Sequence, residues 1–311
     1  MRNICFALIL ALPLAAEVKV QKGDNRVDVE IGGKPFTTFY FGPDTTKPYL
    51  HPLRAASGKV ITRLYPMEKV EGESRDHPHH RGLWFTHGDV NGWDFWGNEP
   101  GEKSPMKGLG TVVLDKINKV SSGKDHGTIE ATFKWLDPSK KQLITETRTM
   151  TFYDDPNLRT IDFDIELKAL EKVTFGDTKE GTFAIRLADA LSEKKGGLMT
   201  NAEGATGMKN VWGKRSPWVD YSGEIGGEKV GVAILDNPKN PRHPTWWHSR
   251  DYGLFAANIF GLRDFENDKS KDGSFVIEAG KTARFRYRVI IHPGDTAGAD
   301  IGKAFDAYAK K

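Results

Sequence analysis

The sequence predicts an all-β fold, a large antiparallel β-sandwich with one short helix near the C-terminal end. The first reason is a hairpin pattern over residues 143–167, whose arms are joined by the turn-forming residues Asp154, Asp155, Pro156 and Asn157. In its second arm polar residues alternate with four apolar ones that should share a buried face: Ile161, Phe163, Ile165 and Leu167. The second reason is that one segment alone has persuasive helical spacing, with an apolar stripe made of Ile301, Ala304, Phe305 and Tyr308.

Shorter strand patterns occupy much of the remaining chain. We expect strands at residues 18–21, 26–31, 83–89, 182–187, 229–235, 253–259, 274–277 and 282–292. Gly32-Gly33 and Asn91-Gly92 are expected to form turns. No Gly/Ser linker, charge run or repeat divides the chain, so residues 17–311 are expected to form a single β-sandwich domain.

Residues 1–16 have the features of a secretory signal peptide. A basic start is followed by a short apolar stretch that ends in small residues. The sequence therefore predicts export to the periplasm or the cell exterior. The only cysteine, Cys5, lies in this segment, so the mature chain would have no thiol for a disulfide, a metal site or a nucleophile.

The charge pattern gives no sign of a nucleic-acid or membrane partner. The formal net charge is +3, from 45 basic and 42 acidic residues, and the basic residues do not form a block. No apolar stretch after residue 17 is long enough to span a membrane. Motifs typical of nucleotide binding and of serine hydrolases are also missing from the sequence.

Five of the nine histidines are concentrated in one part of the chain: His51, His77, His79, His80 and His87. Imidazoles that titrate near neutral pH could exchange protons with a substrate, together with Arg81, Asp89 and Asp94. Alternatively, several of these histidines bind backbone carbonyls in a tight loop. If the segment is extended, His77 and His79 point to one side and His80 to the other. Leu83, Phe85, His87 and Asp89 should share a strand face.

A divalent metal is a separate possibility for this cluster. A pair of histidines two residues apart, with a third nearby, could bind zinc or iron through His77, His79 and His87. The spacing is not specific to any metal, so the expectation that we prefer is a site without a cofactor.

A second cluster follows the proline-rich loop at residues 236–244. If the next segment is extended, an indole, an imidazole, a guanidinium and a phenol line one face: Trp246, His248, Arg250 and Tyr252. Aromatic faces stack on the C–H surfaces of a sugar while polar groups bind its hydroxyls. The alternative is an amphipathic strand whose long side chains cover a sheet.

The third candidate is a charged pair in the predicted hairpin. Glu146 and Arg148 share the more apolar face of the first arm, so they must be paired or must line a cleft. A structural ion pair is the explanation that we favour, although Glu146 is the best candidate for a carboxylate that faces the histidines.

Several long motifs are distinctive, among them residues 47–53 (KPYLHPL), 76–85 (DHPHHRGLWF), 87–96 (HGDVNGWDFW) and 252–258 (YGLFAAN). They resemble a bacterial family of exported proteins of unassigned function labelled "methane oxygenase PmoA". The methane monooxygenase subunit of that name spans the membrane several times, so methane oxidation is not expected here. The resemblance implies a setting among sugar oxidoreductases and glycoside-degrading proteins. More distantly, the chain resembles the galactose-mutarotase-like supersandwich proteins, whose epimerases use a histidine acid and a glutamate base on a concave sheet face.

The leading hypothesis is therefore an exported carbohydrate-active protein that acts on a small sugar or glycoside as an isomerase, lyase or hydrolase. The acid/base or anchoring groups would be His79, His80, His87, Glu146 and His248. The substrate-binding groups would be His51, Arg81, Asp89, Asp94, Arg148, Trp246, Arg250 and Tyr252. The alternatives are a non-catalytic carbohydrate-binding module and a metal-dependent enzyme that uses the histidine cluster.

Overall fold

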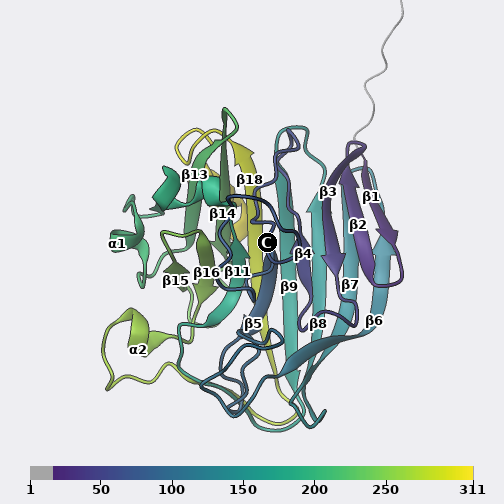
Figure 1. Cartoon of the computed structure of the whole chain (residues 1–311), viewed down its shortest axis with the longest axis vertical. Helices are drawn as coiled ribbons and strands as arrows, with labels where there is room; N and C mark the ends of the chain where they lie inside the picture. The colour runs from purple at the N-terminus through teal and green to yellow at the C-terminus, as the bar shows by residue number, and fades with distance from the viewer. Residues whose placement is uncertain (1–16, 311) are drawn as a thin grey trace, which may run out of the picture.

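Two eight-stranded antiparallel sheets pack face to face in the computed structural model, which describes residues 17–310 (Figure 1). The first sheet has the strand order β1 (Val18–Lys22), β2 (Arg26–Ile31), β3 (Lys34–Tyr40), β4 (Tyr49–His51), β5 (Leu83–His87), β11 (Gly181–Arg186), β16 (Leu254–Asn258) and β15 (Trp246–Ser249). The second has the order β12 (Leu198–Asn201), β13 (Trp218–Ile225), β14 (Glu228–Asp236), β18 (Thr282–Pro293), β9 (Arg159–Ala169), β8 (Gln142–Tyr153), β7 (His126–Leu136) and β6 (Thr111–Ser121). The expected signal peptide at residues 1–16 lies outside the described residues.

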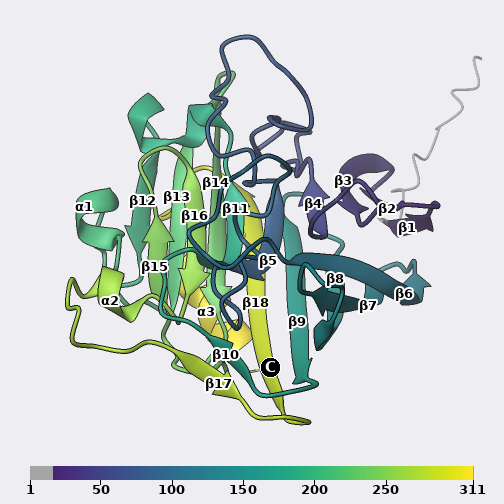
Figure 2. The ribbon, with the colours of Figure 1, turned by 60° about the horizontal axis from the view of Figure 1, so that its bottom comes forward.

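The remaining elements are short. A two-stranded sheet pairs β10 (Val173–Phe175) with β17 (Phe275–Ile277). The helices are α1 (Met208–Val211), α2 (Leu262–Phe265) and α3 (Ile301–Ala309), with 3-10 turns at Asp189–Leu191 and Glu193–Lys195. In both views α1 and α2 lie beside β15, at the end of the first sheet opposite β1 (Figures 1 and 2). Within residues 17–310 no helix is long and apolar enough to cross a membrane.

The predicted hairpin is present as β8 and β9, with Phe152 opposite Ile161 and Met150 opposite Phe163. The four alternating apolar residues of β9 are all buried, as the alternation predicts. The C-terminal helix is also present. In α3, Ile301 and Tyr308 pack on the outer face of the second sheet, so the helix shields that face from solvent.

The main core lies between the two sheets. Phe183 of the first sheet contacts Phe163 of the second, with ring centroids 4.8 Å apart, and Phe85 contacts Phe285 at 5.7 Å. Successive side chains of a strand point to opposite faces. The neighbours of these core residues therefore point away from the second sheet, and the outer face of the first sheet carries the candidate site.

Candidate functional site

One residue from each of six adjacent strands lies in a row across the outer face of the first sheet. The cross-strand row consists of Tyr40, Tyr49, Trp84, Ala184, Ala256 and His248. Adjacent strands are about 4.8 Å apart, so the row is about 24 Å long. Three aromatic rings form one half, a histidine stands at the other end, and two alanines separate them.

The segment at residues 76–80 lies over this face as a tight turn. His77 has a φ of 44°, and the backbone N–H of His80 donates to the carbonyl of His77 at 3.0 Å. The rings of His77 and His80 stack in parallel, 4.8 Å apart, and the ring of His79 meets that of His80 edge-on at 4.4 Å. The expectation that an extended chain sends His80 to the opposite side is therefore wrong, because the turn brings the three rings together.

Two buried arginines hold this turn through one carboxylate. Arg186, at the end of β11, donates from Nη2 to Oδ1 of Asp76 at 2.7 Å, and Nη1 of Arg63 binds the same oxygen. Arg63 also donates from Nη2 to the carbonyl of His77 at 2.9 Å. Burial alone would raise the pKa of Asp76, but the hydrogen bond from His77 and the charges of the two arginines lower it below its usual range. Asp76 is therefore a charged anchor for the turn.

Arg186 also fixes the protonation of His80. Its Nη1 lies 3.2 Å from Nδ1 of His80. A guanidinium can only donate, so Nδ1 must accept and the proton of the neutral ring is on Nε2. Burial, followed by the influence of His79 and Arg186, lowers the pKa of His80 well below its usual value. His80 is thus a neutral hydrogen-bond donor at physiological pH, and its ring stacks on that of Trp84 at 5.4 Å.

Tyr252 joins the two clusters predicted from the sequence. Its ring stacks on that of His77 at 5.2 Å, with 6° between the ring planes, and the guanidinium of Arg186 lies 4.7 Å from its centre. Burial raises the pKa of Tyr252 to about 12, so its hydroxyl stays protonated. The regions around His80 and His248, about 170 residues apart in the chain, therefore meet on one sheet face.

His248 is buried at the end of the cross-strand row. Its ring centre is 6.4 Å from that of Trp212, and burial lowers its pKa to about 3. Burial also lowers the pKa of His79 to about 2 and that of His51 to about 4. The expectation that these imidazoles titrate near neutral pH is wrong, because a buried imidazole loses the solvation that stabilises its charged form.

Many buried polar atoms on and around this face have no hydrogen-bond partner among residues 17–310. They are Nδ1 of His79 and His248, Nε2 of His80, both ring nitrogens of His51, Nε1 of Trp84, Trp96 and Trp212, Oγ1 of Thr86 and Thr182, and Nε of Arg186 and Arg250. Each unsatisfied buried group costs roughly 1–3 kcal/mol, and native proteins keep few of them. Their concentration makes this face the candidate site for a polar ligand.

Two residues of the second cluster, Trp246 and Arg250, are less available for sugar binding than the sequence suggested. Trp246 is on the outer face of β15, but the guanidinium of Arg215 lies 4.5 Å from its ring centre and covers it. Arg250 follows the strand, in the turn that leads to Tyr252, rather than continuing the strand as expected.

Three expected site residues of the first cluster serve the local structure instead. Arg81 donates from Nε and Nη2 to the carboxylate of Glu99 at 2.8 and 2.6 Å. Asp94 accepts from the backbone N–H groups of Trp96 and Gly97 at 2.8 Å each. Asp89 accepts from the N–H of Gly92 at 2.8 Å, in the turn after β5.

His87 is not part of the site. It shares a face with Leu83 and Phe85, as predicted, but that face points to the core, where the His87 ring lies 4.6 Å from that of Phe260. Its Nε2 pairs with the carbonyl of Gly176 at 2.7 Å, and burial lowers its pKa to about 4. The expectation that His87 acts with His80 is corrected, because the two rings lie on opposite faces of the sheet.

The same placement separates the residues expected to bind a metal. His77 and His79 lie on the outer face, whereas His87 lies in the core, so the three do not converge. Across the described part of the chain, no group of three or more His, Cys, Asp or Glu side chains is placed to hold a metal ion.

Glu146 and Arg148 form a buried ion pair on β8, in the second sheet. Oε1 of Glu146 accepts from Nε of Arg148 at 2.7 Å, and Oε2 accepts from Nε1 of Trp135 at 2.8 Å. Both side chains point into the core between the sheets. Glu146 therefore does not face the histidines, and the pair is the structural one that the sequence analysis favoured.

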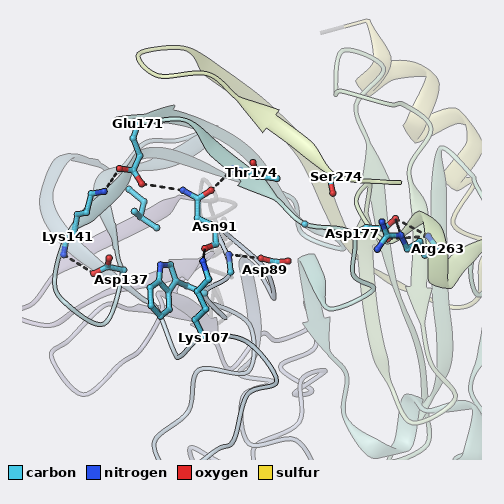
Figure 3. A pocket seen from close by; sticks show the side chains of 14 residues that line it. Asp89, Asn91, Lys107, Asp137, Lys141, Glu171, Thr174, Asp177, Arg263 and Ser274 are labelled. Atoms are coloured by element: carbon cyan, nitrogen blue, oxygen red, sulfur yellow. Dashed lines mark hydrogen bonds and ion pairs between the residues drawn. The ribbon is translucent and has the colours of Figure 1, made fainter. Parts of the chain in front are cut away.

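A pocket of about 760 Å³ lies at a different place, among the loops beside β10 (Figure 3). Of the expected site residues only Asp89 lines it. Its charged groups are largely paired: Glu171 binds Lys141, and Oδ2 of Asp177 accepts from the N–H of Gly273 at 2.6 Å. The unsatisfied atoms on the outer face of the first sheet make that face the better candidate, despite the size of this pocket.

Sequence reasoning missed the two residues that hold the site together, Arg63 and Arg186. The signal for Arg186 was available, since it is a charged residue at the end of an otherwise apolar predicted strand. Arg63 carries no such signal, because its position is set by a long loop. Trp84 was seen only as part of a motif, although its register with Ala184 and Tyr49 places it at the centre of the face.

The family comparison matches residues 26–306 to a model described as "Family of unknown function (DUF6807)". This family description does not carry the methane-oxygenase label suggested by the sequence resemblance. No curated protein matches the chain.

Solved structures with similar folds include a galactose mutarotase-like protein from Clostridium acetobutylicum, at 10% identity and a TM-score of 0.42, over 89% of this chain and 98% of that one. A galactose mutarotase related enzyme from Lactobacillus acidophilus has 10% identity and a TM-score of 0.33, over 90% and 98%. A GH36 alpha-galactosidase from Geobacillus stearothermophilus has 10% identity and a TM-score of 0.39, over 89% of this chain but 40% of its own length. This chain thus spans about two fifths of that alpha-galactosidase.

Proposed function

The chain belongs to DUF6807, a family of unknown function, and we propose that it is a carbohydrate-active protein that binds a sugar against the outer face of its first sheet. The observation that carries the proposal is the set of buried polar atoms around Trp84, His80 and His248 that have no partner in the described part of the chain. A ligand that satisfies them must offer several oxygen atoms at once.

A sugar fits this face better than an apolar ligand. Trp84 and Trp96 have ring centres 5.0 Å apart, and the indole N–H of each has no partner among the described residues. An apolar ligand would leave these donors unsatisfied, whereas a sugar offers hydroxyl oxygens to the N–H groups and C–H surfaces to the rings. Thr86 and Thr182, paired across β5 and β11, add hydroxyls that can donate or accept.

The imidazoles supply the chemistry. The Nε2–H of His80 would donate to a sugar oxygen and polarise it, without a formal charge on the ring. Nδ1 of His79, whose ring centre lies 4.4 Å from that of His80, is the nearby imidazole nitrogen for the return of a proton. This arrangement supports proton transfer at a sugar carbon or at the anomeric oxygen, as in an epimerase, lyase or hydrolase.

A second candidate function is non-catalytic sugar binding. It is favoured by the low pKa values of His79 and His248, about 2 and about 3, which make both rings weak bases. It is also favoured by the pairing of Asp76 with two arginines, because a carboxylate held in this way is a poor general base.

The test is calorimetric titration of the protein with a panel of monosaccharides and methyl glycosides, with products followed by NMR. We expect saturable binding that His80→Asn weakens at least tenfold, since a hydrogen bond and a ring stack are lost. His126→Asn is the matched control because His126 is exposed on β7, and it should bind like the wild type. A product formed by the wild type but not by His80→Asn identifies an enzyme, and binding without a product identifies the binding module. Absence of both binding and product across the panel would overturn the proposal.

A further inference from the structure

Arg250 is a cation of the site that has no anionic partner in the part of the chain that the structure describes. Its side chain is half-buried, its Nε is buried without a hydrogen-bond partner, and no carboxylate among residues 17–310 lies within 4.0 Å of its guanidinium. Its backbone is fixed from both sides: its N–H donates to the carbonyl of Leu254 at 2.7 Å, and its carbonyl accepts from the hydroxyl of Tyr221. The unpaired guanidinium is therefore attached to a well-defined part of the fold.

Three cations surround the ring of Tyr252, and two of them are paired. Arg186 lies 4.7 Å from the ring centre, and Lys194 and Arg250 each lie 5.8 Å from it. Arg186 binds Asp76, and Nζ of Lys194 lies 3.6 Å from the carboxylate of Asp251. Only Arg250 lacks such a partner among the described residues.

The carboxylates around Arg63 and Arg186 are already engaged. Asp76 serves two arginines, because Arg63 binds the same oxygen as Arg186. Asp189 accepts from the N–H and the hydroxyl of Ser74 at 2.7 Å each, and Glu73 accepts from two backbone N–H groups of residues 64 and 65. The histidines add no negative charge. A half-buried guanidinium is therefore left for a group that comes from outside the chain.

We infer that the ligand is an acidic sugar, whose carboxylate is bound by Arg250 and by the free Nε–H of Arg186. This inference rests on the proposed function and adds a substrate class to it. The indole and guanidinium N–H groups of the face are donors only, so they match a ligand rich in acceptor oxygens. The planar fork of arginine matches a carboxylate, and one unpaired guanidinium balances the single charge of a sugar acid better than the larger charge of a sugar phosphate.

The test compares matched sugars by calorimetry at low salt: D-galacturonate with D-galactose, and D-glucuronate with D-glucose. At least one acid should bind about tenfold tighter than its neutral counterpart, as a charge-assisted hydrogen bond allows. Arg250→Gln should weaken binding of that acid about tenfold. Lys194→Gln removes a paired cation beside the same ring and should change the affinity less than twofold.

Equal binding of acid and neutral sugar by the wild type would overturn this inference and leave the proposed function standing. Failure of all four sugars to bind would count against both. Tighter binding of galactose 1-phosphate than of galacturonate would show that the preferred ligand is a sugar phosphate, and would overturn the inference of a sugar acid. If Arg250→Gln does not fold, the wild type still decides: raising the salt from 50 to 500 mM should weaken binding of the acid severalfold and leave that of the neutral sugar unchanged.

Discussion

Nη1 of Arg186 lies 3.2 Å from Nδ1 of His80, and this contact determines which nitrogen of His80 carries the proton. Because arginine stays charged and can only donate, it holds His80 neutral with its N–H at Nε2. The same guanidinium binds Asp76 and contacts Tyr252, so it links the histidine turn to the end of the first sheet.

The first prediction concerns this tautomer. NMR of the ¹⁵N-labelled imidazoles should show that His80 is protonated at Nε2 and stays neutral well below pH 6.5. Arg186→Met removes the donor to Nδ1 and should allow the other tautomer. A wild-type ring protonated at Nδ1 would contradict the assignment.

The second prediction concerns acid stability. Burial lowers the folded-state pKa values of five histidines below their unfolded values: His51, His79, His80, His87 and His248. Their stabilising contribution is present above about pH 6.5 and is lost as the pH falls towards the folded values, because the unfolded chain then binds more protons. Urea unfolding should show a steep loss between pH 6.5 and 4. Replacing His87 with Phe should flatten the slope by up to about 1.4 kcal/mol per pH unit. An unchanged slope would show that His87 is not a buried neutral ring.

The third prediction concerns His292, whose pKa is raised and not lowered in the folded protein. Burial by itself would lower its pKa, but the hydrogen bond with Asp220 at 3.0 Å and the charge of that carboxylate outweigh burial and raise it. The stabilisation is complete below about pH 6.5 and is lost as the pH rises through the raised folded value. His292→Gln should cost roughly 3 kcal/mol at pH 6, because the buried Asp220 then loses its charged partner and keeps the hydroxyl of Thr296, and less at pH 9. An equal cost at both pH values would exclude a charged His292.

The fourth prediction separates the core ion pair from the site. Glu146→Gln leaves Arg148 charged in the core and should cost about 3–5 kcal/mol in urea unfolding. Changing Glu146 and Arg148 together to Met should cost much less, because no buried charge then remains. Sugar binding by the double variant should match the wild type. A loss of binding without a loss of stability would place the pair in the site after all.

Local patterns in the sequence predicted β8, β9 and α3 well, because alternation along a strand and an apolar stripe along a helix depend on neighbouring residues alone. The strands β3, β6, β7 and β13 were not predicted. In β6, register shifts after Leu114 and Ile117 interrupt the alternation, and the middle of the strand is exposed. Two bulges of this kind blur the period that identifies a strand.

The site was only partly predictable. Alternation correctly placed Leu83, Phe85 and His87 on one face, but it cannot say which face meets the second sheet. The positive φ of His77, which turns the segment and brings three rings together, has no signal in the sequence either. The contact of His77 with Tyr252 depends on the pairing of distant strands.

The most direct test of the account is an NMR titration of the tryptophan indole N–H signals with the sugar that binds best in the calorimetric panel. The indoles of Trp84, Trp96 and Trp212 have no partner among the described residues, whereas those of Trp135 and Trp247 are bound to Glu146 and to the carbonyl of Ser216 in the core. We expect signals of the first group to shift on ligand binding while Trp135 and Trp247 stay in place. Shifts confined to Trp93, which lines the other pocket, would contradict a sugar site on the outer face of the first sheet.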